Sequence, residues 1–399
     1  MAKPISSVRI LDLTHMLSGP YASMILADLG AETIKVEPLK GEGTRQLLAS
    51  HPEYSLDGMG AYYLTLNRNK QSVAIDLKSP AGREIFHDLV RKADVVISNF
   101  GVGVPERLKI DYDTLSAINP AIITCTVTGF GSDGPRPRRP AYDQVAQAMG
   151  GGMSITGADP AHPVRSGIPI GDLGGGMFAV IGILSALYER NSSGCGQHVD
   201  ISMLDCQVSM LNYMATMYFL SGEDPCPIGN SHFVHVPYNT FGTSDGFIVI
   251  AVVSDNFWQN LKQVVSCPEF EDPKYDTQPG RWQDRDLINA RLNTLLGENT
   301  SAYWLQRLED LRVPCAPVNR FSQALSDPQI LHRNMVVDLK HPGGKSTKGP
   351  GNPIKLSRSN EESFSAAPLV GQHTRQILSA LLEYDAQKIE RLWQQGAVA

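Results

Sequence analysis

The sequence lacks the short motifs that mark the common nucleotide-binding and hydrolytic enzymes. No G-x-G-x-x-G follows the first apolar run, and no G-x-x-x-x-G-K-[ST] occurs, so the usual phosphate-binding loops are missing. H-E-x-x-H is also absent, and G-x-S-x-G occurs only as GTSDG at 242–246, before a predicted strand, where it does not form the strand-to-helix elbow of an α/β-hydrolase. These absences disfavour a nicotinamide dehydrogenase, a P-loop NTPase, an α/β-hydrolase and an H-E-x-x-H zinc enzyme.

Cysteine and basic charge are both scarce. The six cysteines form no C-x-x-C pair and match no zinc spacing, so we expect free thiols in a reducing compartment. His232 and His235 form an H-x-x-H with no acid or cysteine nearby, and we interpret them as loop residues rather than metal ligands. The net charge of −6 provides no basic field for nucleic acid or an anionic membrane.

Long hydrophobic runs are missing as well. The longest uncharged apolar stretch, 173–188, is shorter than the ~20 residues that span a bilayer, so we expect a buried core helix. The first residues show neither an apolar signal core nor an Arg-rich amphipathic pattern. We therefore expect a cytoplasmic protein that does not associate with membranes.

Short apolar runs alternate with helical patterns in the first half of the chain. Such alternation is typical of a parallel sheet with helices on its faces, and we predict an α/β fold with a Rossmann-like sheet. The predicted strands are 8–13, 33–36, 72–75, 94–98, 122–127 and 198–202, and two of the predicted helices are 21–29 and 81–92.

The composition changes near Glu223. A strand at 246–253 and helical patterns at 255–265, 283–296 and 301–311 predict a smaller α+β domain. After Asp327 the chain is rich in loop-forming residues, and a long amphipathic helix is predicted over 371–395.

Asp172 lies in GDLGGG, directly before the long apolar stretch. The simplest interpretation is an N-cap that accepts hydrogen bonds from the first turn. However, three glycines in one turn weaken a helix by about 1 kcal/mol each, which suggests that a bare surface is needed for a ligand to approach. A helix N-terminus also favours the ionised carboxylate, the form that a nucleophilic Asp needs.

Other candidates lie in loops that follow predicted strands, where doubly wound sheets bind ligands. His15 follows the first strand, with an ordinary loop histidine as the alternative. Basic side chains at positions 35, 45, 68, 70 and 107 could together bind phosphates, although each alone is typical of a solvated surface.

Several strings, in order along the chain, resemble the class III CoA-transferases, the family of formyl-CoA transferase and the carnitine CoA-transferase. The longest are VRILDLTHMLSGPYASMILADLGAETIKVEPLKGEGTR, LNRNKQSVAIDLKSPAGR, AYDQVAQAMGG, GDLGGGMFAVIGILSALYER and YNTFGTSDGFIVIA. The tail PLVGQHTRQIL is similar to relatives that use succinyl-CoA and dicarboxylic acids. The resemblance implies transfer of CoA from an acyl-CoA donor to a free carboxylic acid, with a CoA thioester as substrate and no permanently bound cofactor or metal.

The same resemblance implies an architecture that residue spacing does not reveal. The large Rossmann-like domain would be built from both chain ends, 1–222 and 328–399, and the small α+β domain from 223–327. Two subunits of this family thread through each other as interlocked rings, which implies a homodimer.

The resemblance also implies residue roles. Asp172 matches the nucleophile, which forms an aspartyl anhydride and then an aspartyl-CoA thioester. CoA-binding positions match Asn99, Phe100 and Arg107, and Arg45 is expected near the phosphates. The acyl pocket matches His15 and Tyr142.

Two departures bear on the substrate. Formyl-transferring members have Gln where this chain has Leu17, and a glycine-rich loop where it has GNSHFVHVP at 229–237. We therefore expect a larger, partly apolar acyl group, and the tail favours a C4 or C5 dicarboxylate. Arg165 or His235 could bind the distal carboxylate.

Two other functions fit the sequence less well. A 2-methylacyl-CoA racemase of the same superfamily needs two opposed acid–base groups, but this chain has Tyr142 where those enzymes place His. A phenol with a pKa of about 10 is a poor base at neutral pH. A non-catalytic CoA-binding protein would not need the exposed Asp172.

Overall fold

The computed structural model describes residues 3–359 and 362–399, which form two compact units. The large unit contains 1–152, 165–220 and 329–399, and the small unit contains 153–164 and 221–328. The segment 153–164, which was predicted to belong to the large domain, groups with the small unit. One contact that ties it there is the hydrogen bond from the backbone N–H of Gly229 to the carbonyl of Gly157, at 2.9 Å.

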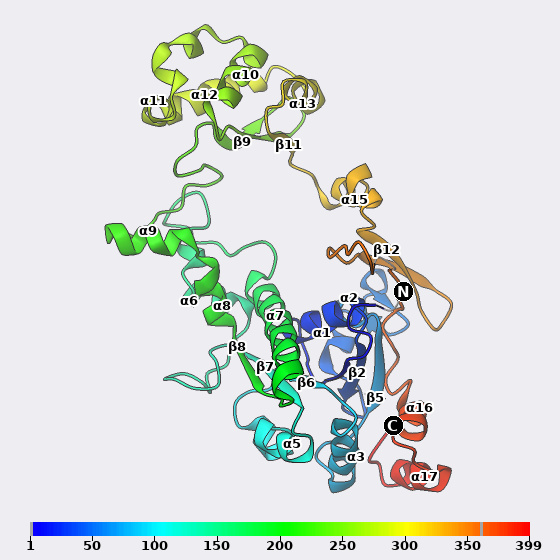
Figure 1. Cartoon of the computed structure of the whole chain (residues 1–399). Coiled ribbons are helices and arrows are strands. Elements are labelled where there is room, and N and C mark those ends of the chain that lie inside the picture. Colours follow the sequence, from blue (N-terminus) through cyan, green and yellow to red (C-terminus); the bar gives the residue numbers. More distant parts are fainter. Residues whose placement is uncertain (1–2, 360–361) are drawn as a thin grey trace. The chain divides into compact units, whose positions relative to one another are not determined.

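The centre of the large unit is a six-stranded parallel sheet in the order β5-β2-β1-β6-β7-β8 (Figure 1). Every strand predicted for the first half of the chain is present, so the α/β prediction is confirmed. The strands are β1 Arg9–Asp12, β2 Glu32–Glu37, β5 Lys70–Ala74, β6 Val95–Ser98, β7 Ile123–Thr128 and β8 His198–Ser202.

Helices cover both faces of this sheet because neighbouring strand residues point to opposite sides. Ile10 packs with α1 and α7 on one face, whereas Leu11 packs with α3, α5 and the C-terminal helices on the other. The helices of this unit are α1 Ser18–Asp28, α2 Ala61–Leu66, α3 Pro80–Val90, α4 Val104–Leu108, α5 Tyr112–Ile118, α6 Asp143–Met149, α7 Ile170–Ser193, α8 Met203–Met210, α9 Tyr213–Ser221, α15 Pro328–His332, α16 Thr374–Gln376 and α17 Ala386–Gln394.

Helix α7 contains the predicted apolar stretch. Its length and composition would allow it to cross a membrane, and half of its most apolar window is buried in the protein. Ala179, Val180 and Ile183 pack into the core beside the sheet. Its exposed side carries apolar residues too, among them Tyr188, which is 81% exposed.

The C-terminal region differs from its prediction in two places. The loop-rich stretch after Asp327 contains an antiparallel hairpin, β12 Val336–Lys340 and β13 Ser346–Pro350. The single long helix predicted over 371–395 is wrong. A left-handed Glu383 and the N-cap Asp385 interrupt it, so that α16 and a π-turn at Ile377–Leu381 are separated from α17.

The small unit has its own apolar core, around Phe241, Trp258 and Leu292. Its antiparallel sheet has the order β11-β10-β9. The elements are β9 Tyr238–Gly242, β10 Phe247–Ala251, β11 Cys315–Pro317, α10 Asp255–Val265, α11 Gln278–Gln283, α12 Arg285–Leu296, α13 Ser301–Asp310 and α14 Phe321–Ala324.

Candidate active site

A cavity of about 340 Å³ opens at the carboxyl edge of the parallel sheet. Loops that follow β1, β6 and β7 line it, together with the first turn of α7. This is the edge at which open α/β sheets bind their ligands. The cavity brings together six of the predicted site residues: His15, Asn99, Phe100, Arg107, Tyr142 and Asp172.

Asn99 holds the loop that carries His15. The side-chain oxygen of Asn99 accepts a hydrogen bond from the His15 backbone N–H at 2.9 Å, and its amide donates to the His15 carbonyl at 2.6 Å. The rings of His15 and Phe100 lie 5.6 Å apart, centroid to centroid. Burial lowers the pKa of His15, so the neutral imidazole is the favoured form in the folded protein.

The N-terminus of α7 is capped by Asp143, not by Asp172. Oδ1 of Asp143 accepts from the backbone N–H of Gly171 at 2.8 Å and, more weakly, from that of Asp172 at 3.4 Å. Gln147 donates to the other oxygen of Asp143 at 2.7 Å. The capping interpretation of Asp172 is therefore wrong: within the described part of the chain, its carboxylate makes no hydrogen bond and lines the cavity.

The environment of Asp172 raises its pKa to about 6, first through burial and second through the neighbouring charge of Asp143. The expectation that the helix N-terminus favours ionisation is thus outweighed by desolvation and by a like charge. At neutral pH the carboxylate is still mainly ionised. A partly desolvated carboxylate is a stronger nucleophile than a fully hydrated one.

The glycines after Asp172 serve helix packing rather than ligand approach. A Cβ on Gly176 would lie 2.7 Å from the backbone oxygen of Ser18 in α1, and one on Gly174 would lie 2.6 Å from Met210 in α8. α1 and α8 therefore pack directly against the first turn of α7. The interpretation of these glycines as an open ligand surface is wrong.

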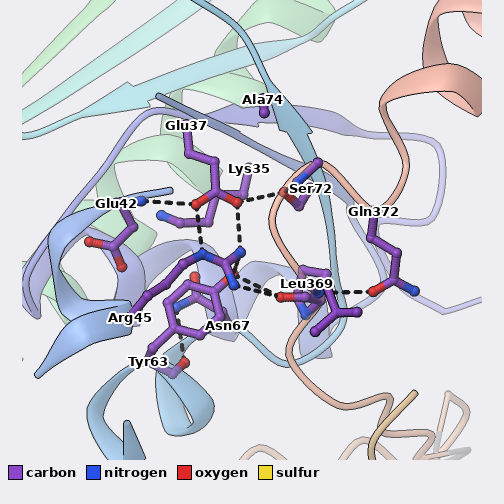
Figure 2. Close-up of polar contacts among 12 residues, drawn as sticks. Lys35, Glu37, Glu42, Arg45, Tyr63, Asn67, Ser72, Ala74, Leu369 and Gln372 are labelled. Carbon is purple, nitrogen blue, oxygen red and sulfur yellow. Dashed lines mark hydrogen bonds and ion pairs between the residues drawn. The ribbon is translucent and has the colours of Figure 1, made fainter. Parts of the chain in front are cut away.

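Four of the five basic residues proposed as a phosphate-binding set are buried and already partnered. Arg45 pairs with Glu37 at 2.6 Å and donates to the Pro368 carbonyl at 3.0 Å, inside the polar cluster of Figure 2. The other three are Arg68, paired with Asp28, Lys70, paired with Asp12, and Lys35, which donates to the Thr14 carbonyl. We therefore leave Arg45 out of the CoA site. Arg107, in contrast, is exposed at the cavity.

The remaining candidates lie outside this cavity. Leu17 lines a second cavity, of about 420 Å³, on the other side of its loop. Arg165 is exposed and donates to the carbonyls of Ser166 and Gly167. His235 belongs to the small unit, where its ring lies 4.7 Å from that of His232.

Sequence reasoning missed three contributors to the site. Arg138 and Arg139 line the first cavity from a proline-rich basic loop that was visible in the sequence as PRPRRP. Asp143 was missed because its cap crosses 28 residues of sequence, which no local pattern indicates. Among the described residues, no group of three His, Cys, Asp or Glu side chains is arranged to hold a metal ion.

Comparison with known proteins identifies the family. The model of CoA-transferase family III matches residues 5–374. The chain belongs to CoA-transferase family III.

Curated relatives of this class III CoA-transferase cover nearly its whole length. Succinyl-CoA:glutarate CoA-transferase of Mus musculus is 36% identical, over 99% of this chain and 90% of that protein. Succinyl-CoA:mesaconate CoA-transferase of Haloarcula hispanica is 35% identical, over 94% of this chain and 95% of that protein. Formyl-CoA:oxalate CoA-transferase of Streptomyces coelicolor is 32% identical, over the full length of both chains.

The fold agrees with this assignment. A crystal structure of a CAIB/BAIF family protein from Brucella suis superposes with a TM-score of 0.86 at 34% identity, covering 96% of this chain and 100% of that one. The prediction of a class III CoA-transferase that uses a CoA thioester as substrate is confirmed, and the racemase alternative is not favoured.

Proposed function

We propose that this enzyme transfers CoA between a dicarboxylyl-CoA, with succinyl-CoA as the first candidate, and a free carboxylic acid, with Asp172 as the nucleophile. One observation carries the assignment of Asp172. Because Asp143 caps α7, the carboxylate of Asp172 is not needed as a cap, and it lines the same cavity as Arg107 and Asn99. The names of the mouse and Haloarcula relatives support succinyl-CoA as donor and a C4 or C5 dicarboxylate as acceptor.

The proposed chemistry needs only covalent catalysis. The Asp172 carboxylate attacks the donor thioester carbonyl, and the CoA thiolate leaves as an acyl-aspartyl anhydride forms. The thiolate then attacks the Asp172 carbonyl, which releases the donor acid and leaves an aspartyl-CoA thioester. The acceptor carboxylate repeats these two steps in reverse and leaves as its CoA ester. Covalent storage keeps the thioester energy that water would otherwise dissipate.

CoA itself fits two adjoining cavities. His15 and Phe100 also line a third, largely apolar cavity of about 430 Å³, which contains Ile75 and has Lys78 at its rim. We place the adenine in this third cavity and the pantetheine arm in the first, beside Asp172. Arg107, Arg138 and Arg139 would then neutralise the phosphates between them.

We also propose a homodimer. Large apolar side chains lie exposed at the end of α9, where Phe219 is 79% and Leu220 83% exposed, and on α7 at Tyr188. Exposed apolar groups of this size are typical of protein–protein interfaces.

The test is a transfer assay on the purified protein with succinyl-CoA and a panel of acids that includes glutarate, mesaconate, itaconate, malate and citramalate. New CoA esters, detected by mass spectrometry, are expected with the wild type and not with Asp172→Ala. Asp286→Ala is the matched control, because this aspartate is exposed on α12 of the small unit. Undiminished transfer by Asp172→Ala would refute the assignment of the nucleophile.

A further inference from the structure

The second cavity beside Asp172 is a groove that follows helix α1. Its wall on that side is formed by residues spaced four, seven, eight and eleven positions after Leu17. This spacing places them on one face of the helix. They are Tyr21, Met24, Ile25 and Asp28, and the facing wall includes Tyr62, Leu66, Leu173 and Met335.

One end of the groove adjoins the nucleophile. Pro169, which directly precedes α7, and Leu173, which follows Asp172, both line it. Tyr62 lies there as well: burial, and next the charge of Asp172, raise the pKa of its phenol to about 12. Asp172 lines the polar first cavity, and its neighbour Leu173 lines the apolar groove. A thioester carbon beside this carboxylate could have its CoA arm in the first cavity and its acyl chain in the groove.

The opposite end is closed by a buried ion pair whose two charges neutralise each other. Arg68 binds Asp28 at 2.7 Å, and the side chains of both are only 2% exposed. Asn69 donates a further hydrogen bond to Asp28 at 2.8 Å. A second carboxylate placed here would lack an unmatched cation, which makes the groove unfavourable for a charged chain end.

The groove is longer than the acids named for the relatives. Leu17 and Asp28 are eleven residues apart on α1, which corresponds to about 16 Å along the helix axis. An extended carbon chain advances about 1.25 Å for each bond of about 1.5 Å, so the two carboxyl carbons of a C5 diacid are at most about 5 Å apart. A short diacid would therefore leave most of the apolar wall in contact with water.

We propose that the groove along α1 holds the acyl chain of a medium-chain monocarboxylic acid of about six to ten carbons, whose extended chain of about 6–11 Å fits within the length of the groove. This inference rests on the proposed function, because it places the acyl group on the nucleophile Asp172. It adds a second acceptor class to the short diacids. Each methylene that enters the groove is expected to improve kcat/KM up to about fourfold, until the groove is filled.

The test compares straight-chain acids from C4 to C10 as acceptors for succinyl-CoA, with the full-length protein. We expect kcat/KM to rise with chain length. Ile25, a partly buried residue of the groove, provides a matched pair of variants. Ile25→Phe should lower the ratio of kcat/KM for octanoate to that for butyrate at least tenfold, and Ile25→Ala should not lower it. A binding measurement on Asp172→Asn is independent of turnover, and octanoyl-CoA should bind more tightly than butyryl-CoA.

The outcomes separate this inference from the proposed function. If short acids are converted but kcat/KM falls beyond C5, and both Ile25 variants leave the ratio unchanged, the groove assignment is refuted while CoA transfer stands. If no acid is converted, the proposed function fails. In that case the binding measurement alone tests the groove. If octanoyl-CoA binds no more tightly than butyryl-CoA, the groove assignment is refuted.

Discussion

At the scale of single residues, Asp172 connects the chemistry to the stability of the fold. Its pKa of about 6 in the folded protein lies above the ordinary value of 3.8. The folded state is therefore stabilised while this group is protonated. That stabilisation is fully present below about pH 4 and is lost as the pH rises through about 6.

We expect Asp172→Asn to abolish transfer and yet to raise the free energy of unfolding at pH 8. The gain is about 1–2 kcal/mol, allowing for partial exposure of the side chain, and it should disappear near pH 4. Urea denaturation at both pH values measures it. In the wild type, kcat/KM should fall as the pH drops below about 6. A variant less stable than the wild type at pH 8 would contradict a desolvated Asp172.

At the scale of elements, the close packing of α1 on α7 fixes the position of the nucleophile. Gly176 has no room for a side chain, because a Cβ there would meet the backbone of Ser18 and the ring of Tyr21 at 2.9 Å. Gly176→Ala should lower the free energy of unfolding by about 1–3 kcal/mol, despite the higher helix propensity of Ala. Transfer should slow as well, since α7 carries Asp172.

Gly167 is the matched control for this substitution. It lies in the loop just before α7, and no atom is within 4 Å of the Cβ that alanine would add. Gly167→Ala should therefore leave the urea midpoint nearly unchanged. Equal effects of the two substitutions would show that the packing of α1 on α7 is not responsible.

Helices and strands with a strong local sequence pattern were predictable, whereas features that depend on contacts between residues remote in sequence were not. The strands are short, β-branched and buried on both sides, so 94–98 and 122–127 were readable as strands. The interruption of the predicted C-terminal helix at Glu383 was not predictable, because the apolar periodicity continues across that residue. In the site, the loops after strands pointed to His15, and the family resemblance pointed to Asn99 and Arg107. The burial of Arg45 depends on partners remote in sequence, as does the capping by Asp143.

At the scale of the whole molecule, the C-terminal segment completes the large unit. The backbone N–H of Ala399 donates to the carbonyl of Ala74 at the edge strand β5, at 3.2 Å. Nearby, the buried pair of Arg45 and Glu37 links the N-terminal part of the sheet to Pro368. The two ends of the chain thus stabilise one sheet.

Arg45→Ala should lower the free energy of unfolding by about 3–5 kcal/mol, because it leaves the buried Glu37 carboxylate without its cation. Arg107→Ala should keep the wild-type melting temperature and raise the KM for the acyl-CoA donor about tenfold, through the loss of a charge-assisted phosphate contact worth about 1.5 kcal/mol. Thermal melts and steady-state kinetics on both variants measure this contrast. The reverse pattern would return Arg45 to the CoA site and remove Arg107 from it.

The central claim is that Asp172 carries CoA covalently, and intact-protein mass spectrometry after brief incubation with succinyl-CoA tests it most directly. We predict a wild-type species heavier by one CoA less one water, mapped by proteolysis to the peptide with Asp172 and absent from Asp172→Asn. The same adduct on Asp172→Asn, or on another residue of the wild type, would contradict the account.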